Sequence, residues 1–113
     1  MSDPNLLKTA RIRELNDQLR CNGLGGRIVI TRGLDALGTA IVCQVAAAVA
    51  SFDNFTEDND PWGEHDCAVL TVNGRRIIFK IEYYDPELRY HSPDASDPAV
   101  TQRVMTIMLA EEY

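Results

Sequence analysis

The tetrapeptide Val72-Asn73-Gly74-Arg75 restricts the fold of this chain more than any other feature of its sequence. Asn-Gly readily adopts the positive backbone φ that both central residues of a two-residue type I′ hairpin turn require. The tetrapeptide also separates two runs of alternating apolar and polar residues, 65–72 and 75–84. The sequence therefore predicts a tight antiparallel hairpin in which Val72 faces Arg75, and every other pairing follows from that register.

The hairpin register predicts which side chains share a face of the sheet. One face, which includes Ala68 opposite Phe79, is apolar and is expected to face the core. The polar side chains of the other face are His65, Lys80, Glu82 and Tyr84, with His65 directly opposite Glu82. Two interpretations of this polar face stay open. It is either an exposed cross-strand ion pair worth about 0–1 kcal/mol, or a catalytic cluster in which the carboxylate orients the imidazole for acid–base chemistry.

Helices are expected on both sides of the hairpin in the sequence. Asp3-Pro4 begins the first, over residues 4–20, because an aspartate caps free N–H groups and a proline has none to lose. The second runs over residues 39–52, and Asp97-Pro98 opens the third. The apolar face of the third predicted helix consists of Val100, Val104, Ile107 and Met108.

Two further strands complete the predicted sheet. Residues 27–31 are apolar and mostly β-branched, which is typical of a central strand covered on both faces. Residues 88–91 form a second, shorter strand. The 113 residues are enough for one core, so we expect one α+β domain over residues 1–113. Its sheet is mostly antiparallel with about four strands, covered by three helices, in the order α-β-α-β-β-β-α.

The charge of the chain is unevenly distributed. Residues 1–50 carry six basic and four acidic side chains, whereas residues 51–113 carry five basic and thirteen acidic ones. The loop 53–66 has no Lys or Arg and contains Asp53, Glu57, Asp58, Asp60, Glu64 and Asp66. Such a surface repels a phosphate backbone and attracts basic surfaces. We therefore expect a basic protein as partner and no direct nucleic-acid binding through this half.

The same loop contains candidate ligands for a metal ion. Asp58, Asp60 and Gly63 match the opening of a calcium-binding loop, but Trp62 stands at its fifth position and Val69 where a bidentate glutamate is required. A standard EF-hand is therefore excluded. A looser oxygen site for a divalent cation stays open, and its candidate ligands are Asp58, Asp60, Glu64 and Asp66. No other cofactor is expected.

The cysteines and the apolar runs predict a cytoplasmic location. Cys21, Cys43 and Cys67 are odd in number and widely spaced, unlike a disulfide framework or a zinc ribbon. No apolar run approaches the roughly 20 residues of a membrane span, and residues 1–5 lack the features of a secretory signal. We expect neither membrane insertion nor secretion.

Several segments resemble a family of short bacterial proteins classed as a domain of unknown function. The resemblance extends over nearly the whole chain and is carried by residues 11–17 (RIRELND), 52–55 (FDNF), 59–66 (NDPWGEHD), 80–85 (KIEYYD) and 106–113 (TIMLAEEY). It implies no established activity and no catalytic residues. Such proteins often occur among plasmid and mobile-element genes, so the resemblance implies an accessory or defence-related role.

Three functional hypotheses follow. In the first, the chain is a small acidic interaction module or inhibitor that binds a basic protein through the loop 53–66 and the adjacent sheet face. Its contact residues are Asp58, Asp60, Trp62, Glu64 and Asp66. In the second, it is a metal-assisted hydrolase or nuclease-like enzyme, with His65 as acid/base, Glu82 as its orienter or as a second base, and Lys80 as the anion stabiliser. In the third, the polar cluster is structural and the chain acts as a homo-oligomer.

Overall fold

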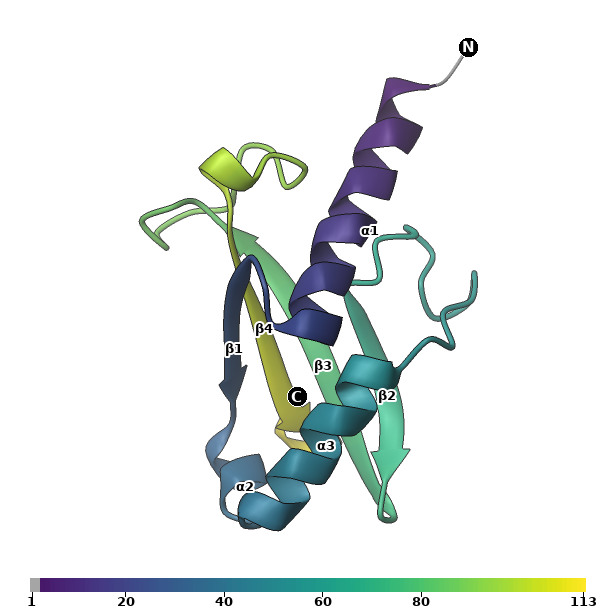
Figure 1. Cartoon of the computed structure of the whole chain (residues 1–113), viewed down its shortest axis with the longest axis vertical. Coiled ribbons are helices and arrows are strands. Elements are labelled where there is room, and N and C mark those ends of the chain that lie inside the picture. The colour runs from purple at the N-terminus through teal and green to yellow at the C-terminus, as the bar shows by residue number, and fades with distance from the viewer. Residues whose placement is uncertain (1–2) are drawn as a thin grey trace.

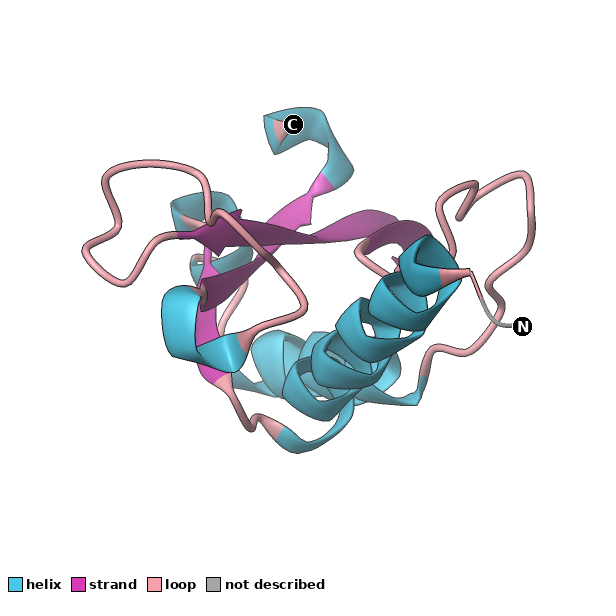
Figure 2. Cartoon of the chain, turned by 90° about the horizontal axis from the view of Figure 1, so that it is seen from above, coloured by secondary structure: helices cyan, strands magenta, loops and turns pink. Residues whose placement is uncertain are grey.

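Two long helices lie on one face of a four-stranded sheet in the computed structural model, which describes residues 3–113 (Figures 1 and 2). The elements are α1 (Pro4–Asn22), β1 (Gly26–Ile30), α2 (Arg32–Asp35), α3 (Thr39–Ser51), β2 (Cys67–Val72), β3 (Arg75–Tyr84) and β4 (Gln102–Leu109), with 3₁₀ turns η1 (Pro98–Val100) and η2 (Ala110–Glu112). The predicted α+β class is confirmed.

The predicted hairpin is present with the predicted register. β2 and β3 are antiparallel, and Val72 faces Arg75 while Cys67 faces Lys80. Asn73 and Gly74 have φ values of 50° and 76°, the positive values that a type I′ turn requires. The Asn-Gly dipeptide thus fixed the pairing of the two strands.

The sheet is mixed rather than purely antiparallel. Its strand order is β1-β4-β3-β2, with β3 antiparallel to both neighbours and β1 parallel to β4. β1 therefore lies at an edge, and the prediction of a central strand over 27–31 is wrong. The exposed fractions of Ile28 and Val29 are both 46%, as expected for an edge strand.

The segment after residue 97 differs most from its prediction. Asp97 does act as a cap, since its side chain accepts from the Ala99 N–H at 2.9 Å, but only the short turn η1 follows. The chain then enters β4, which lies between β1 and β3. The expected third helix is therefore wrong. The expected strand over 88–91 is also absent, and only an isolated bridge joins Tyr84 to His91.

The first helix follows its prediction closely. The Asp3 carboxylate accepts from the Asn5 N–H at 2.9 Å, and Pro4 occupies the first helical position. Gly23 ends α1 with φ 69°, the left-handed conformation that glycine adopts without steric cost. α1 and α3 pack against each other and cover the same face of the sheet (Figure 2).

The hydrophobic core lies between this helical layer and the sheet. Its fully buried centre consists of Leu19, Leu34, Val45, Val49, Ile77, Phe79, Met105 and Ile107. The opposite face, here called the open face, is covered by no helix of residues 3–113 apart from the turn η2 (Figure 2). By the strand register its side chains include Arg27, Val29, Cys67, Val69, Ile78, Lys80, Glu82, Tyr84, Val104 and Thr106. No helix within residues 3–113 is long and apolar enough to cross a membrane.

Candidate functional site

His65 lies on the helical side of the sheet and not beside Glu82. The β2–β3 ladder begins at Cys67, and His65 takes a positive φ of 55° before it. Its ring Nδ1 lies 2.9 Å from Asp17 Oδ1 of α1, and its ring stacks on Phe55 with centroids 3.9 Å apart. The predicted His65–Glu82 pair is wrong, because the backbone of His65 takes a left-handed conformation two residues before the strand begins at Cys67.

The other three predicted catalytic residues do lie together, on the open face. Lys80 Nζ is 3.7 Å from Glu82 Oε1, and the Tyr84 hydroxyl donates to Glu82 Oε2 at 2.9 Å. This hydrogen bond raises the pKa of Tyr84. The sheet therefore separates His65 from the group that the hydrolase hypothesis assigned to orient it.

The acidic side chains of the loop 53–66 do not converge as a metal site. Asp60 is 8% exposed, and its carboxylate accepts the His65 N–H at 3.2 and 3.3 Å. The Glu64 carboxylate accepts from the Tyr83 hydroxyl at 2.8 Å. Asp66 is half-buried, and burial raises its pKa. Across residues 3–113 no three His, Cys, Asp or Glu side chains form a group that could hold a metal ion.

Side chains of α1 anchor the loop through its backbone. Arg13 donates to the Gly63 carbonyl at 3.0 Å, and Asn16 donates to the Glu64 carbonyl at 3.0 Å. The predicted contact residues Asp60 and Glu64 therefore belong to the inside of the loop. Sequence reasoning missed these anchors because each hydrogen bond joins residues about 50 positions apart.

Asn16 is also the centre of a buried polar network. Its amide donates to the Tyr83 hydroxyl at 2.8 Å, and its oxygen accepts from Arg103 Nε at 2.9 Å. The Arg103 guanidinium lies 5.2 Å from the centroid of the Tyr83 ring and also donates to the Ala95 carbonyl. Burial, together with the hydrogen bond to Glu64, raises the pKa of Tyr83, and burial lowers the pKa of Arg103.

Arg20 fixes the start of the loop. Its guanidinium donates to the carbonyls of Val49 and Phe52 at 3.1 and 2.5 Å, and it pairs with Asp17 at 3.0 Å. These carbonyls lie at the C-terminal end of α3, where backbone acceptors lack helical partners. The Arg20 Cζ atom lies 5.2 Å from the Phe55 ring centroid. Arg20 thereby joins α1, α3 and the loop.

The outer surface of the loop keeps its charge exposed to solvent. Trp62 is 77% exposed, an unusual position for the largest apolar side chain. The exposed acidic residues beside it in the loop are Asp53, Glu57 and Asp58. Figure 1 shows the loop, in teal, beside α1. Of the predicted contact residues, only Asp58 and Trp62 are therefore exposed, and Asp53 and Glu57 join them.

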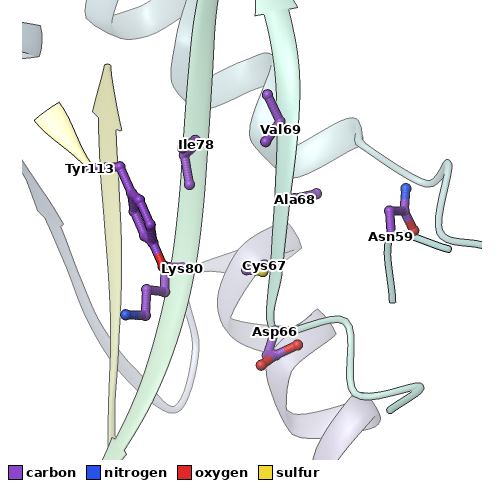
Figure 3. Close-up of a pocket in the computed structure, with 8 residues that line it drawn as sticks. All are labelled: Asn59, Asp66, Cys67, Ala68, Val69, Ile78, Lys80 and Tyr113. Atoms are coloured by element: carbon purple, nitrogen blue, oxygen red, sulfur yellow. The ribbon is translucent and has the colours of Figure 1, made fainter. Parts of the chain in front are cut away.

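A cavity of about 420 Å³ lies where the loop meets the sheet. β2 runs between Asn59 on one side and Lys80 and Tyr113 on the other (Figure 3). The remaining lining residues are Asp66, Cys67, Ala68, Val69 and Ile78. Burial is the main cause that raises the pKa of Cys67, which favours the neutral thiol over the nucleophilic thiolate. The cavity therefore offers an apolar recess with a carboxylate at one end.

Residues 30–112 match the family described as protein of unknown function (DUF3768). The chain belongs to this family. The predicted membership of a family of unknown function is thereby confirmed, and the loop 53–66 lies within the matched DUF3768 region. Arg13, Asn16 and Arg20, which anchor that loop, precede it. No curated protein and no solved structure matches the chain.

Proposed function

We propose that this chain is an interaction module that binds a basic protein surface in the bacterial cytoplasm. The binding surface is the loop 53–66 together with the adjoining open face. The observation that carries the proposal is the contrast within the loop: its backbone is held by part-buried hydrogen bonds, while a tryptophan and three acidic side chains are exposed to solvent. These exposed side chains are Asp53, Glu57, Asp58 and Trp62.

A fixed loop suits binding because little conformational entropy is lost when a partner arrives. Ordering a mobile side chain at an interface costs roughly 0.5–1.5 kcal/mol. The donors from Arg13 and Asn16 hold the loop before any partner binds. Trp62 is of the residue type most often found at the energetic centre of interfaces. The loop thus offers an exposed aromatic anchor together with three exposed acidic side chains.

Exposed charges of one sign favour rapid and selective encounter with a surface of the opposite sign. Asp53, Glu57 and Asp58 carry this charge, and the neighbouring Val69 and Ile78 of the open face add apolar contact area. One form of this role is inhibition, in which the loop covers a basic surface that the partner uses for nucleic acid. The accessory role implied by the family resemblance agrees with such a function.

Affinity capture from cells of the source organism tests the proposal. The bait variant carries Asp53→Asn, Glu57→Gln and Asp58→Asn, which neutralise the exposed acids without touching an anchoring hydrogen bond. We expect the wild-type chain to enrich a basic protein at low salt. The variant should capture at least tenfold less of this protein. Raising the salt from roughly 0.05 to 0.5 M should weaken the wild-type complex, because exposed charges are screened.

The matched control carries Asp35→Asn, Glu87→Gln and Glu111→Gln, which neutralise three exposed acids elsewhere on the surface. The net charge changes equally, so this control is expected to retain the partner. Equal loss in both variants would assign the binding to overall charge and contradict the role of the loop. Binding that is indifferent to salt would contradict the electrostatic mechanism.

A further inference from the structure

β2 is a free edge of the sheet with unpaired backbone groups. It is the last strand in the order β1-β4-β3-β2 within residues 3–113. The Ile81 N–H donates to the Asp66 carbonyl at 2.7 Å. Because backbone groups alternate in direction along a strand, the even-numbered residues of β2 turn their N–H and C=O groups toward β3. The N–H and C=O groups of Cys67, Val69 and Thr71 therefore point outward, and all three residues are exposed.

The cavity and the charges beside this edge match an added strand. The cavity of about 420 Å³ borders Cys67, Ala68 and Val69, so it follows the first half of β2. Asp66 directly precedes the strand and lines the cavity together with Asn59 of the loop, whereas Arg75 and Arg76 follow the turn at the end of the strand. A basic side chain is therefore favoured at the start of β2 and opposed near the turn.

We propose that an extended segment of a basic partner protein pairs with β2 as a fifth strand. This inference rests on the proposed function and names the way in which the partner binds. Main-chain hydrogen bonds to Cys67, Val69 and Thr71 would supply affinity, as in other complexes in which a peptide extends a sheet. The carboxylates of Asp66 and of the loop would select the basic residues.

The alternation of side chains specifies the segment further. Residues of an added strand that stand beside Val69 share the open face with Ile78, where an apolar side chain fits. The residues between them point to the helical side, where Asp66 and the loop lie. The expected segment therefore alternates apolar and basic residues over about four to six positions.

A capped hexapeptide of alternating lysine and valine is the probe. Its affinity for the full chain is measured by titration calorimetry, and backbone amide exchange is followed by NMR. We expect binding to slow exchange at Val69 and Thr71, whose N–H groups point outward. A peptide N-methylated on the residues that face β2 should bind at least tenfold more weakly, because it cannot form the main-chain bonds.

Two chain variants separate this edge from the opposite one. Val69→Pro removes an outward N–H of β2, and Ile28→Pro is the matched change on β1. The Thr31 N–H donates to the Ile107 carbonyl, so Thr31 turns its backbone groups toward β4. Because these directions alternate along a strand, the backbone N–H of Ile28 points away from the sheet. Val69 and Ile28 are both 46% exposed. We expect Val69→Pro to weaken peptide binding at least tenfold and Ile28→Pro to leave it unchanged.

The outcomes distinguish this inference from the proposed function. Equal binding of the plain and N-methylated peptides would overturn strand addition and leave electrostatic capture by the loop standing. Protection at Ile28 and Ile30 instead of β2 would also overturn it, as would self-association of the chain through either edge or an absence of peptide binding. The proposed function itself is tested separately, by the capture experiment with the neutralised loop.

Discussion

Asn16 is the residue at which α1, the loop and the sheet meet. It is fully buried, and its side chain bonds the Glu64 carbonyl, the Tyr83 hydroxyl and Arg103 Nε. A buried amide is compatible with a stable interior when its hydrogen bonds are satisfied. Each of these partners would in turn lose a hydrogen bond if Asn16 were removed. The geometry of the loop therefore depends on a residue that precedes the matched family region.

Replacing Asn16 by alanine should destabilise the chain by about 2–3 kcal/mol, because it leaves buried donors and acceptors without partners. Urea unfolding followed by circular dichroism measures this change. Gln18→Ala is the control, since Gln18 is an exposed residue of the same helix, and its effect should stay within about 0.5 kcal/mol. Similar losses in the two variants would contradict the role assigned to the network.

Glu112 holds the C-terminal turn η2 against the β1–α2 junction. Its carboxylate accepts from the Thr31 hydroxyl at 2.6 Å, the Gly33 N–H at 3.2 Å and the Leu109 N–H at 3.0 Å. The hydrogen bond from Thr31, followed by that from Leu109, lowers the pKa of Glu112 below its ordinary value. The charged form is therefore the one that the folded chain favours.

A lowered pKa in the folded chain gives stability that is complete above the unfolded pKa and is lost as pH falls through the folded pKa. We expect the urea midpoint of the wild-type chain to exceed that of Glu112→Gln at about pH 7. This difference should shrink as the pH falls to about 3. A difference that stays constant with pH would show that the carboxylate charge has no part in holding the turn.

At the scale of elements, β4 shows why a strand was predicted as a helix. Its segment Val104–Leu109 is continuously apolar apart from Thr106, and such a run does not distinguish a helix from a strand covered on both faces. β4 lies between β1 and β3, and its buried residues Arg103, Met105 and Ile107 alternate with half-exposed residues that lie on the open face. The cap at Asp97 was read correctly, but it starts only a short turn.

The misplacement of β1 follows from that of β4. Without a strand after residue 97, residues 27–31 had no parallel neighbour and their apolar character indicated a central position. The parallel pairing of Gly26 with Arg103 joins residues far apart in sequence, so no local signal reports it. The hairpin, by contrast, is encoded locally by Asn73 and Gly74, and its register was predicted correctly for Cys67–Val72.

The hairpin turn allows a direct test of this local code. Gly74→Ala places a side chain at φ 76° and should cost about 1–2 kcal/mol of stability, because the left-handed region is strained for residues with a Cβ. Asn73→Gly keeps a residue that tolerates positive φ and should change stability by less than about 1 kcal/mol. Urea unfolding measures both, and equal destabilisation would contradict the turn type.

At the scale of the whole molecule, the sequence located the candidate surface but not its internal structure. The concentration of acidic residues in 53–66 marked the loop. Which carboxylates point inward depends on partners such as His65 and Tyr83, which only the folded chain places beside them. His65 likewise takes a positive φ and contacts Asp17 of α1, a residue far away in the sequence, and it therefore lies outside the predicted catalytic cluster.

The exposed loop is therefore the part of the molecule on which the functional account depends. A photo-crosslinking amino acid placed at Trp62 reports contacts of the loop inside the cell. Tyr90 is the matched control position, because it is 74% exposed against 77% for Trp62 and lies in a different loop.

Crosslinking at position 62 in living cells, with position 90 in parallel, tests the account most directly. We expect a discrete product with a basic protein at position 62, its loss when Asp53, Glu57 and Asp58 are neutralised, and no such product at position 90. The same product at both positions, or a product at 62 that survives neutralisation of the loop, would contradict the account.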